Sequence, residues 1–394
     1  MRLIHTADWH LGQLFFDYDR KAEHMLFLEW LKGKIGELRV DLLLIAGDIF
    51  DSPNPSAESQ RMYYHFLRDV TAANPELQII IIAGNHDSAA RLEAPNPLLE
   101  DMRISVRGVV KRLDDGEIDF EHLIVPLDKG GYCLAVPYLR QGDYPDAETY
   151  TQGVRNMYED IYRKVENRGA PIIAMGHLQA TGSEISETDR SERTIIGGLE
   201  CVSPDSFHPD IVYTALGHLH RAQRVSKREN LRYAGAPLPM SFAEKNNKQG
   251  VTLVEITDTT KIERIEFDAP VKLLSIPAEP MPLSDVLLAI AELPEGEIDA
   301  ASPYLEIKIA ITEPEPSLRH QIEEALKTKS VRLARIVAIT PKRDTEMPTI
   351  SYEQLQTINP MDMAIDIYRR RFGGEDMPEK MKTLLQGLIR EEGI

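Results

Sequence analysis

The chain has 394 residues, of which 42% are hydrophobic and 27% charged, as expected for a soluble globular protein of two or three domains. Its two cysteines, Cys133 and Cys201, argue against a disulfide scaffold or a thiolate zinc site, and the lack of a signal peptide or long apolar run predicts a cytoplasmic protein without a membrane segment. The formal net charge of −18 argues against tight, unaided binding of nucleic acid, but divalent cations or a partner subunit could supply positive charge to a nuclease.

Apolar runs in the first two thirds of the chain predict buried strands that alternate with helices. The predicted strands are residues 2–6, 40–46, 79–83, 104–110, 134–136, 171–175 and 211–216, followed by a hairpin at 251–256 and 262–267. Helices are predicted at 21–31, with His24 on its surface, at 154–165, and from a cap at Ser56 to about residue 70. The polar residues 182–193 predict a mobile surface loop. This alternation is typical of an α/β fold.

A change in composition at residues 268–270 separates these elements from a second, smaller α/β unit. The predicted elements of this unit are helices at 283–293 and 318–326 and strands at 304–311 and 332–340. Two short amphipathic helices, 360–372 and 378–390, follow a polar link. We therefore expect three domains, with boundaries at 1–269, 270–341 and 342–394.

Five predicted strands end in side chains that bind metals, mostly after a glycine. The candidates are Asp8 and His10, Asp48, Asn85 with His86, His177, and His218 with His220. Strand ends of this kind face the ligand crevice of α/β proteins, and oxygen and imidazole donors without a thiolate suit Mn²⁺. Seven ligands exceed the needs of one ion, so two ions about 3.5–4 Å apart that share a carboxylate are expected. We interpret the remaining histidines as structural or exposed: His5, His24, His65, His122, His208 and His320.

The order of these motifs resembles that of the calcineurin-like metallophosphoesterases. The motifs are Asp8-x-His10, Gly47-Asp48-x-x-Asp51, Gly84-Asn85-His86-Asp87, Gly176-His177 and Gly217-His218-x-His220. More narrowly, the chain resembles the nuclease subunits of bacterial complexes that repair double-strand breaks. The motifs cover about the first 270 residues, and the remainder agrees in layout only. The resemblance implies a four-layer α/β/β/α sandwich with a small α/β capping domain and a C-terminal helical tail.

The resemblance also implies a role for each side chain. It assigns Asp8, His10 and His220 to one metal, and Asn85, His177 and His218 to the other. By the same resemblance, Asp48 would bridge both ions. His86, without a metal, would donate a proton or stabilise charge in the transition state, and Asp51 would orient His86. Asp87 would support the ligands or serve a structural role.

The activity implied is an Mn²⁺-dependent DNA nuclease, with Mg²⁺ as the alternative ion. It would act as a 3′–5′ exonuclease on duplexes and an endonuclease on single strands in DNA end processing, repair and recombination. A small-molecule phosphodiesterase or nucleotidase is the alternative, and a non-catalytic scaffold is disfavoured because every expected ligand is present. Arg221, Arg224 and Arg140 could hold the DNA; the alternative is that the basic run after His220 is an ordinary solvated hairpin.

The resemblance implies three partners: DNA, a second copy of the chain, and an ATPase of the SbcC type. The chain lacks a Gly-rich phosphate loop, so any ATP dependence must come from the ATPase. The candidates for the homodimer contact are Met62, Tyr63, Tyr64 and Phe66, although core packing explains them equally well. We expect the C-terminal helices to dock on the ATPase; the alternative is that they pack on their own α/β unit.

Overall fold

The computed structural model describes residues 1–184, 201–311, 315–339, 361, 365, 368–369 and 376–391. Residues Met1–Thr340 form one compact unit and Pro341–Ile394 form a second. Within the described residues, none of the helices has the length and apolar character needed to cross a membrane.

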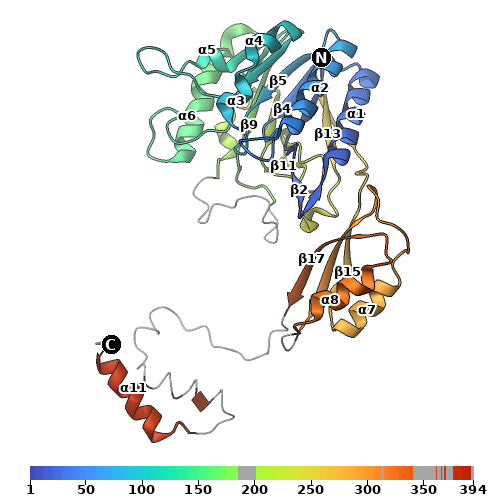
Figure 1. The fold of residues 1–394 in the computed structure, drawn as a ribbon. Coiled ribbons are helices and arrows are strands. Elements are labelled where there is room, and N and C mark those ends of the chain that lie inside the picture. Colours follow the sequence, from blue (N-terminus) through green and yellow to red (C-terminus); the bar gives the residue numbers. More distant parts are fainter. Residues whose placement is uncertain are drawn as a thin grey trace. The chain divides into compact units, whose positions relative to one another are not determined.

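Two sheets form the centre of the first unit (Figure 1). One sheet has the order β14-β13-β1-β4-β5-β6, with strands Thr260–Glu266, Gly250–Ile256, Arg2–Thr6, Leu42–Ala46, Gln78–Ile82 and Ile104–Arg107. The other has the order β11-β12-β10-β9-β8-β7, with strands Gln223–Val225, Arg228–Tyr233, Tyr213–Gly217, Ile172–His177, Tyr132–Ala135 and Ile124–Pro126. Strands β1, β4, β5 and β6 are parallel to one another, as are β8, β9, β10 and β12. Each set therefore has its carboxyl ends at one edge of its sheet.

Helices cover the outer faces of both sheets, and apolar side chains fill the three spaces between the layers. Helices α1 (Lys21–Leu38) and α2 (Ala57–Ala73) pack on the first sheet, and α6 (Tyr150–Arg163) packs on the second. Between the sheets, Leu44 and Ile80 meet Ile173 and Tyr213. The α/β/β/α sandwich predicted from the motifs is confirmed. The short helices are α3 (Ala89–Glu93), α4 (Asn96–Leu99), α5 (Phe120–Leu123) and the 3₁₀ turns η1 (Glu100–Met102), η2 (Glu166–Arg168), η3 (Pro204–Ser206) and η4 (Phe242–Glu244).

The smaller α/β unit is a parallel sheet in the order β15-β16-β17, with helices α7 and α8 packed on it. Its elements are β15 (Leu273–Met281), α7 (Leu283–Ala291), β16 (Tyr304–Ala310), α8 (Leu318–Leu326) and β17 (Arg332–Ile339). Strand β15 was not predicted, because Pro277 and Pro280 interrupt the apolar pattern of its sequence. An edge strand tolerates proline, since one side of its backbone needs no ladder partner.

A buried aromatic cluster joins this α/β unit to the sandwich. Phe15, from the hairpin of β2 (Leu14–Phe15) and β3 (Tyr18–Asp19), packs with Phe242, Val271 and Tyr304. The Tyr304 hydroxyl donates a hydrogen bond of 2.7 Å to Glu23 Oε1 at the start of α1. Because these contacts are buried and include a charged acceptor, they hold the two parts together firmly.

Several local predictions need correction or completion. Ser56 caps α2 as predicted, accepting a hydrogen bond from the Ser59 amide. His24 was expected on the surface of α1, but it is fully buried, because α1 packs against the sheet on that face. Most of the predicted loop 182–193 and of the helix 360–372 lies outside the described residues. The second tail helix is present as α11 (Glu379–Glu391).

Candidate metal centre

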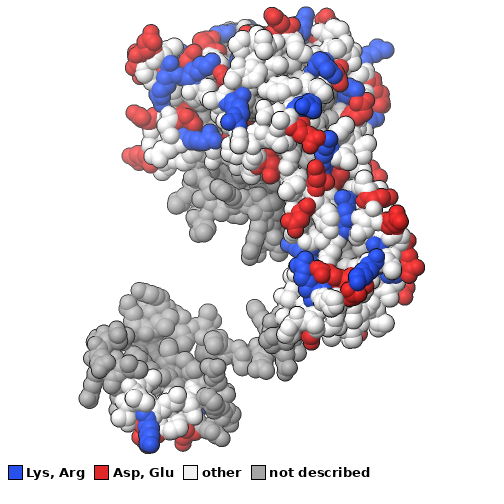
Figure 2. Space-filling view, in the orientation of Figure 1, with Lys and Arg blue, Asp and Glu red and all other residues white. Residues whose placement is uncertain are grey.

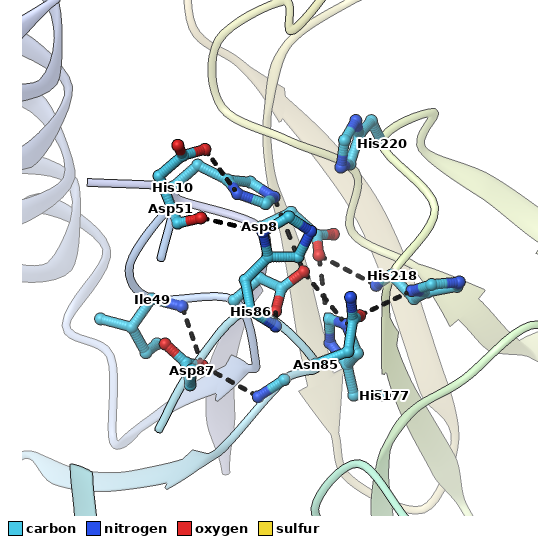
Figure 3. A network of polar contacts seen from close by, with 12 residues as sticks. Asp8, His10, Ile49, Asp51, Asn85, His86, Asp87, His177, His218 and His220 are labelled. Atoms are coloured by element: carbon cyan, nitrogen blue, oxygen red, sulfur yellow. Dashed lines mark hydrogen bonds and ion pairs between the residues drawn. The ribbon is translucent and has the colours of Figure 1, made fainter. Parts of the chain in front are cut away.

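The carboxyl ends of strands from both sheets meet at one site (Figure 3). Asp8 follows β1, Asp48 follows β4, and Asn85 follows β5; His177 ends β9, and His218 follows β10. Figure 3 shows Asn85, His177 and His218 gathered on one side of the site and His10 on the other, with His86 between them. The structure thus brings together all seven side chains that the sequence analysis selected as ligands.

Asp8, His10 and His220 form the first group that could hold an ion. Their ligand atoms lie within 4.8 Å of one another, and all three residues are buried. The rings of His10 and His220 meet edge to face at 5.2 Å between centroids. Asp8 also accepts a hydrogen bond of 2.9 Å from the His218 backbone amide through Oδ1, which links this group to the neighbouring one.

Asp48, Asn85, His177 and His218 form the adjoining group. His177 Nε2 lies 3.3 Å from Asp48 Oδ2 and 2.9 Å from Asn85 Oδ1, and His218 Nδ1 lies 3.0 Å from the same Asn85 oxygen. The Nδ1–H of His177 is donated to the Ala46 carbonyl at 2.9 Å. Since a carbonyl only accepts, Nε2 is the His177 atom left to face a cation.

Asp48 belongs to two of the clusters, which suits a shared ligand. It groups with Asp8 and His177 on one side, and with His10 and His86 on the other. His10 Nε2 lies 3.6 Å from Asp48 Oδ2, and the His86 amide donates to Asp48 Oδ1 at 2.9 Å. One carboxylate therefore contacts both halves of the site.

Glycines and left-handed backbone turns let the strand ends approach this closely. Four candidate ligands have positive φ angles: Asp8 (55°), His10 (46°), Asp48 (50°) and His218 (100°). A Cβ on Gly84 would lie 2.1 Å from Asp48 Oδ1, and one on Gly217 would lie 1.9 Å from the Ala46 carbonyl oxygen. Backbone strain concentrated in this way is typical of functional sites.

The chemistry of the site fits divalent cations. Asp8 Oδ2 and His10 Nε2 are buried without a hydrogen-bond partner among the described residues, and burying such groups is costly unless a charge compensates. Burial raises the pKa of Asp8. Burial would lower the pKa of His177, but Asp48 and Asp8 raise it to about 9. The two carboxylates thus attract positive charge, and the donor set is nitrogen and oxygen alone, as Mn²⁺ and related ions prefer.

His86 and Asp51 are adjacent, but their contact differs from the expected one. The backbone carbonyl of Asp51 accepts the hydrogen bond from His86 Nδ1 at 2.9 Å. The Asp51 carboxylate instead lies 3.4 Å from His10 Nδ1. The His86 ring is 4.8 Å from the His10 ring, at the centre of the site.

Two further carboxylates support the site. Asp87 accepts hydrogen bonds from the amides of Gly84, Ile49 and Phe50, and so ties the loop after β5 to the loop after β4. Burial raises the pKa of Asp87 to about 6. Glu244 lies 3.3 Å from His220 Nδ1, a contact that the sequence analysis missed. No sequence pattern marks Glu244, because only the folded chain brings it to His220.

The basic residues selected for DNA contact are exposed and mostly paired. Arg221 pairs with Glu184 at 2.6 Å, and Arg224 pairs with Glu229. They lie at and beside the hairpin β11–β12. Their ion pairs are those expected of a solvated hairpin, the alternative to DNA contact. Arg140 lies over the Tyr138 ring at 5.4 Å, and that ring is 6.2 Å from His177. Arg140 therefore stands at the edge of the metal centre.

Residues 1–222 match the family of calcineurin-like phosphoesterases, and residues 269–372 match a family described as the type 5 capsule protein repressor C-terminal domain. The chain therefore belongs to the calcineurin-like phosphoesterases.

Three relatives, each named as the SbcD subunit of the nuclease SbcCD, are similar along most of the chain. The Rhodobacter capsulatus protein is 37% identical over 87% of this chain and 88% of its own length. The Escherichia coli K12 protein is 28% identical over 99% of this chain and 97% of its own length. The Bacillus subtilis protein is 32% identical over 65% of this chain and 66% of its own length. Within the phosphoesterases, the chain belongs to the family of these SbcD proteins.

Proposed function

We propose that this chain is the nuclease subunit of an SbcCD-type complex and hydrolyses DNA phosphodiesters with two Mn²⁺ ions. It would act as a 3′–5′ exonuclease on duplexes and an endonuclease on single strands, in the cytoplasm. The observation that carries the proposal is the convergence of seven candidate ligands from five strand ends at one buried site. The relatives' names, which describe them as part of the nuclease SbcCD, support a nucleic-acid substrate. The unpaired Cys133 and Cys201 suit a reducing compartment.

In this reaction the chain's residues would bind the ions, orient one another and transfer a proton. Two divalent ions, when bound, supply Lewis acidity and activate a water for attack on phosphorus. Asp8, His10 and His220 would hold one ion, Asn85, His177 and His218 the other, and Asp48 both. His86 would hold or deliver a proton at Nε2, because the Asp51 carbonyl fixes Nδ1–H and the ring plane. The Asp51 carboxylate would orient His10, and not His86 as the resemblance implied.

We propose that residues 1–269 form the catalytic domain, 270–341 a capping domain that contacts DNA, and 342–394 the segment that binds an SbcC-like ATPase. The buried cluster around Tyr304 would let the capping domain position substrate relative to the ligands. Figure 2 shows Lys and Arg interspersed with Asp and Glu over the face in view. Unaided DNA affinity should therefore be weak, with Arg140, Arg221 and Arg224 as local contacts and the ATPase supplying the remainder.

We also propose a homodimer formed through α1 and α2. A groove of about 340 Å³ lies between these helices, lined by the apolar Met25, Leu28, Met62 and Phe66 together with charged and polar residues such as Lys21 and Glu58. Met25 is 53% exposed, whereas Tyr63 and Phe66 are buried in the core. Met62 therefore remains a contact candidate and Met25 joins it, whereas Tyr63 and Phe66 are set aside. Tyr64, which is half-buried, packs against the core at the other side of α2.

An assay of three substrates tests the activity. The purified chain is incubated with linear duplex DNA, circular single-stranded DNA and bis-p-nitrophenyl phosphate, each with Mn²⁺, Mg²⁺ or chelator. Mn²⁺-dependent cleavage of both DNAs is expected, and an SbcC-like ATPase with ATP should increase duplex degradation. Cleavage of the small ester without cleavage of either DNA, with or without the ATPase, would indicate a small-molecule phosphodiesterase. Inertness toward all three would indicate a scaffold.

A further inference from the structure

The His220 side chain contacts a buried glutamate from a separate segment of the chain. His220 Nδ1 lies 3.3 Å from Glu244 Oε1, and the two residues are only 6% and 3% exposed. An ionised carboxylate can only accept a hydrogen bond, so Nδ1 carries the hydrogen and Nε2 keeps its lone pair. A neutral imidazole binds a metal through the lone pair of its unprotonated nitrogen, which here is Nε2.

We propose that Glu244 is a positioning residue that fixes the ring orientation and tautomer of His220, and thereby sets the affinity of the group Asp8, His10 and His220 for its cation. The proposal rests on the proposed role of His220 as a ligand. A carboxylate behind a metal-binding histidine also raises the basicity of the ring, and losing it typically costs about 10–100-fold in metal affinity.

Glu244 is itself held in place by its own segment. Its second oxygen, Oε2, accepts a hydrogen bond of 3.0 Å from the Met240 amide. The carbonyl of the preceding residue, Pro239, accepts a hydrogen bond of 2.7 Å from Arg20 Nη1. Arg20 is fully buried and pairs with Glu23. The carboxylate is therefore fixed by contacts outside the metal group, as a preorganised support must be.

The same segment reaches the capping domain. Phe242, two residues before Glu244, packs at 5.4 Å between centroids against Phe15, and the Arg335 guanidinium lies 5.2 Å from the Phe242 ring. Glu23, which pairs with Arg20, also accepts a hydrogen bond from the Tyr304 hydroxyl of the capping domain. Glu244 thus connects the ligand His220 with the surface on which the capping domain rests.

A double-mutant cycle separates positioning from general support of the fold. Mn²⁺ is titrated by calorimetry into chelator-stripped Glu244→Ala, His220→Ala and the double variant, and the thermal stability of each metal-free protein is measured. Glu93→Gln is the matched control, because Glu93 is also a buried glutamate, 3.3 Å from a histidine nitrogen (His122) and 2.8 Å from a backbone amide (Gly108).

We expect Glu244→Ala to weaken one of two Mn²⁺ sites by about 10–100-fold, Glu244→Gln to restore part of this, and Glu93→Gln to leave both sites unchanged. In the His220→Ala background, Glu244→Ala should have no further effect on affinity. An equal loss in both backgrounds, or no loss in the wild type, would overturn the positioning role. If His220→Ala itself bound both ions normally, the ligand assignment of His220 would fail instead.

Discussion

The Nε2 atom of His177 lies 3.3 Å from Oδ2 of Asp48, although the two residues come from different sheets. The same Oδ2 atom also lies 3.6 Å from Nε2 of His10. The centre is therefore a junction between the sheets, and its predicted behaviour follows from which residues span that junction.

Asp48→Ala should disable both metal positions. The variant removes the one carboxylate shared by the two clusters, so bound cations would face each other without a bridge. We expect the Mn²⁺ content measured by elemental analysis to fall below two per chain, and DNA cleavage to fall by at least about 10²–10³-fold. Asp160→Ala, at a half-buried position of α6 where the carboxylate pairs with Arg163, is the control. Retention of two ions with a loss of only a few fold would show that Asp48 does not bridge.

His86→Gln should abolish hydrolysis without loss of metal. His86 stands among the ligands, but it is fixed through Nδ1 to the Asp51 carbonyl. Loss of a group that transfers a proton costs about 10²–10⁴-fold in rate. The rate on duplex DNA and the Mn²⁺ content are measured together, with the exposed His320→Gln as control. A lower metal content would make His86 a ligand, a role that its cluster with His10 and Asp48 also permits.

Met62→Glu should separate the proposed dimer. A carboxylate at this partly buried, apolar position of the groove between α1 and α2 would have to lose its hydration when two copies associate. Sedimentation velocity at micromolar concentration should show a dimer for the wild type and a folded monomer for the variant. Leu288→Glu, at an exposed position on α7, should leave the dimer intact. A monomeric wild type contradicts the proposal.

Acidification should destabilise the fold through His5. Burial, followed by the charge of Arg264, lowers the pKa of His5 from 6.5 to about 3. Between these values the unfolded chain binds a proton that the folded chain does not, so the free energy of unfolding decreases as the pH falls below 6.5. The free energy of unfolding of metal-free protein is measured by denaturant titration at pH 7 and at pH 5. The decrease from pH 7 to pH 5 should be about 1–2 kcal/mol smaller in His5→Gln than in the wild type. An identical pH difference in both would show that His5 titrates normally.

Deleting residues from Ile350 onward should abolish binding to the ATPase while preserving Mn²⁺-dependent cleavage of single strands. Met381 and Leu384 on α11 are 47% and 71% exposed, and a short helix with an uncovered apolar stripe suits docking on a partner. In the full chain, Leu384→Asp should weaken co-purification, whereas Thr383→Asp should not. Unchanged affinity of the truncated chain for the ATPase would make the tail structural.

The set of candidate ligands was predictable because it depends on local patterns. A short run of β-branched residues such as Ile79 to Ile82 indicates a strand buried on both faces, and the polar residues after it then lie at the edge of the sheet. The five motifs, in their order along the chain, therefore selected the seven candidate ligands together with His86. Edge strand β15 was missed, since the same reasoning treats proline as a break.

Contacts between distant segments were beyond the sequence. His24 has a polar side chain on an amphipathic helix, and only the packing of α1 shows that it is buried. Asp51 lies three residues after Asp48, but the turn directs its carboxylate to His10 and its carbonyl to His86.

The sequence by itself determined the strands that end in the candidate ligands, their polar ends and hence the chemistry of the centre, because apolar periodicity and residue type act locally. The tertiary structure alone decided which atoms meet. His177 reaches Asp48 across two sheets, and Glu244 reaches His220 from a segment pinned by Arg20. Such contacts depend on how closely packed layers bring remote backbone together, and the glycines at positions 84 and 217 permit that approach without specifying the partner.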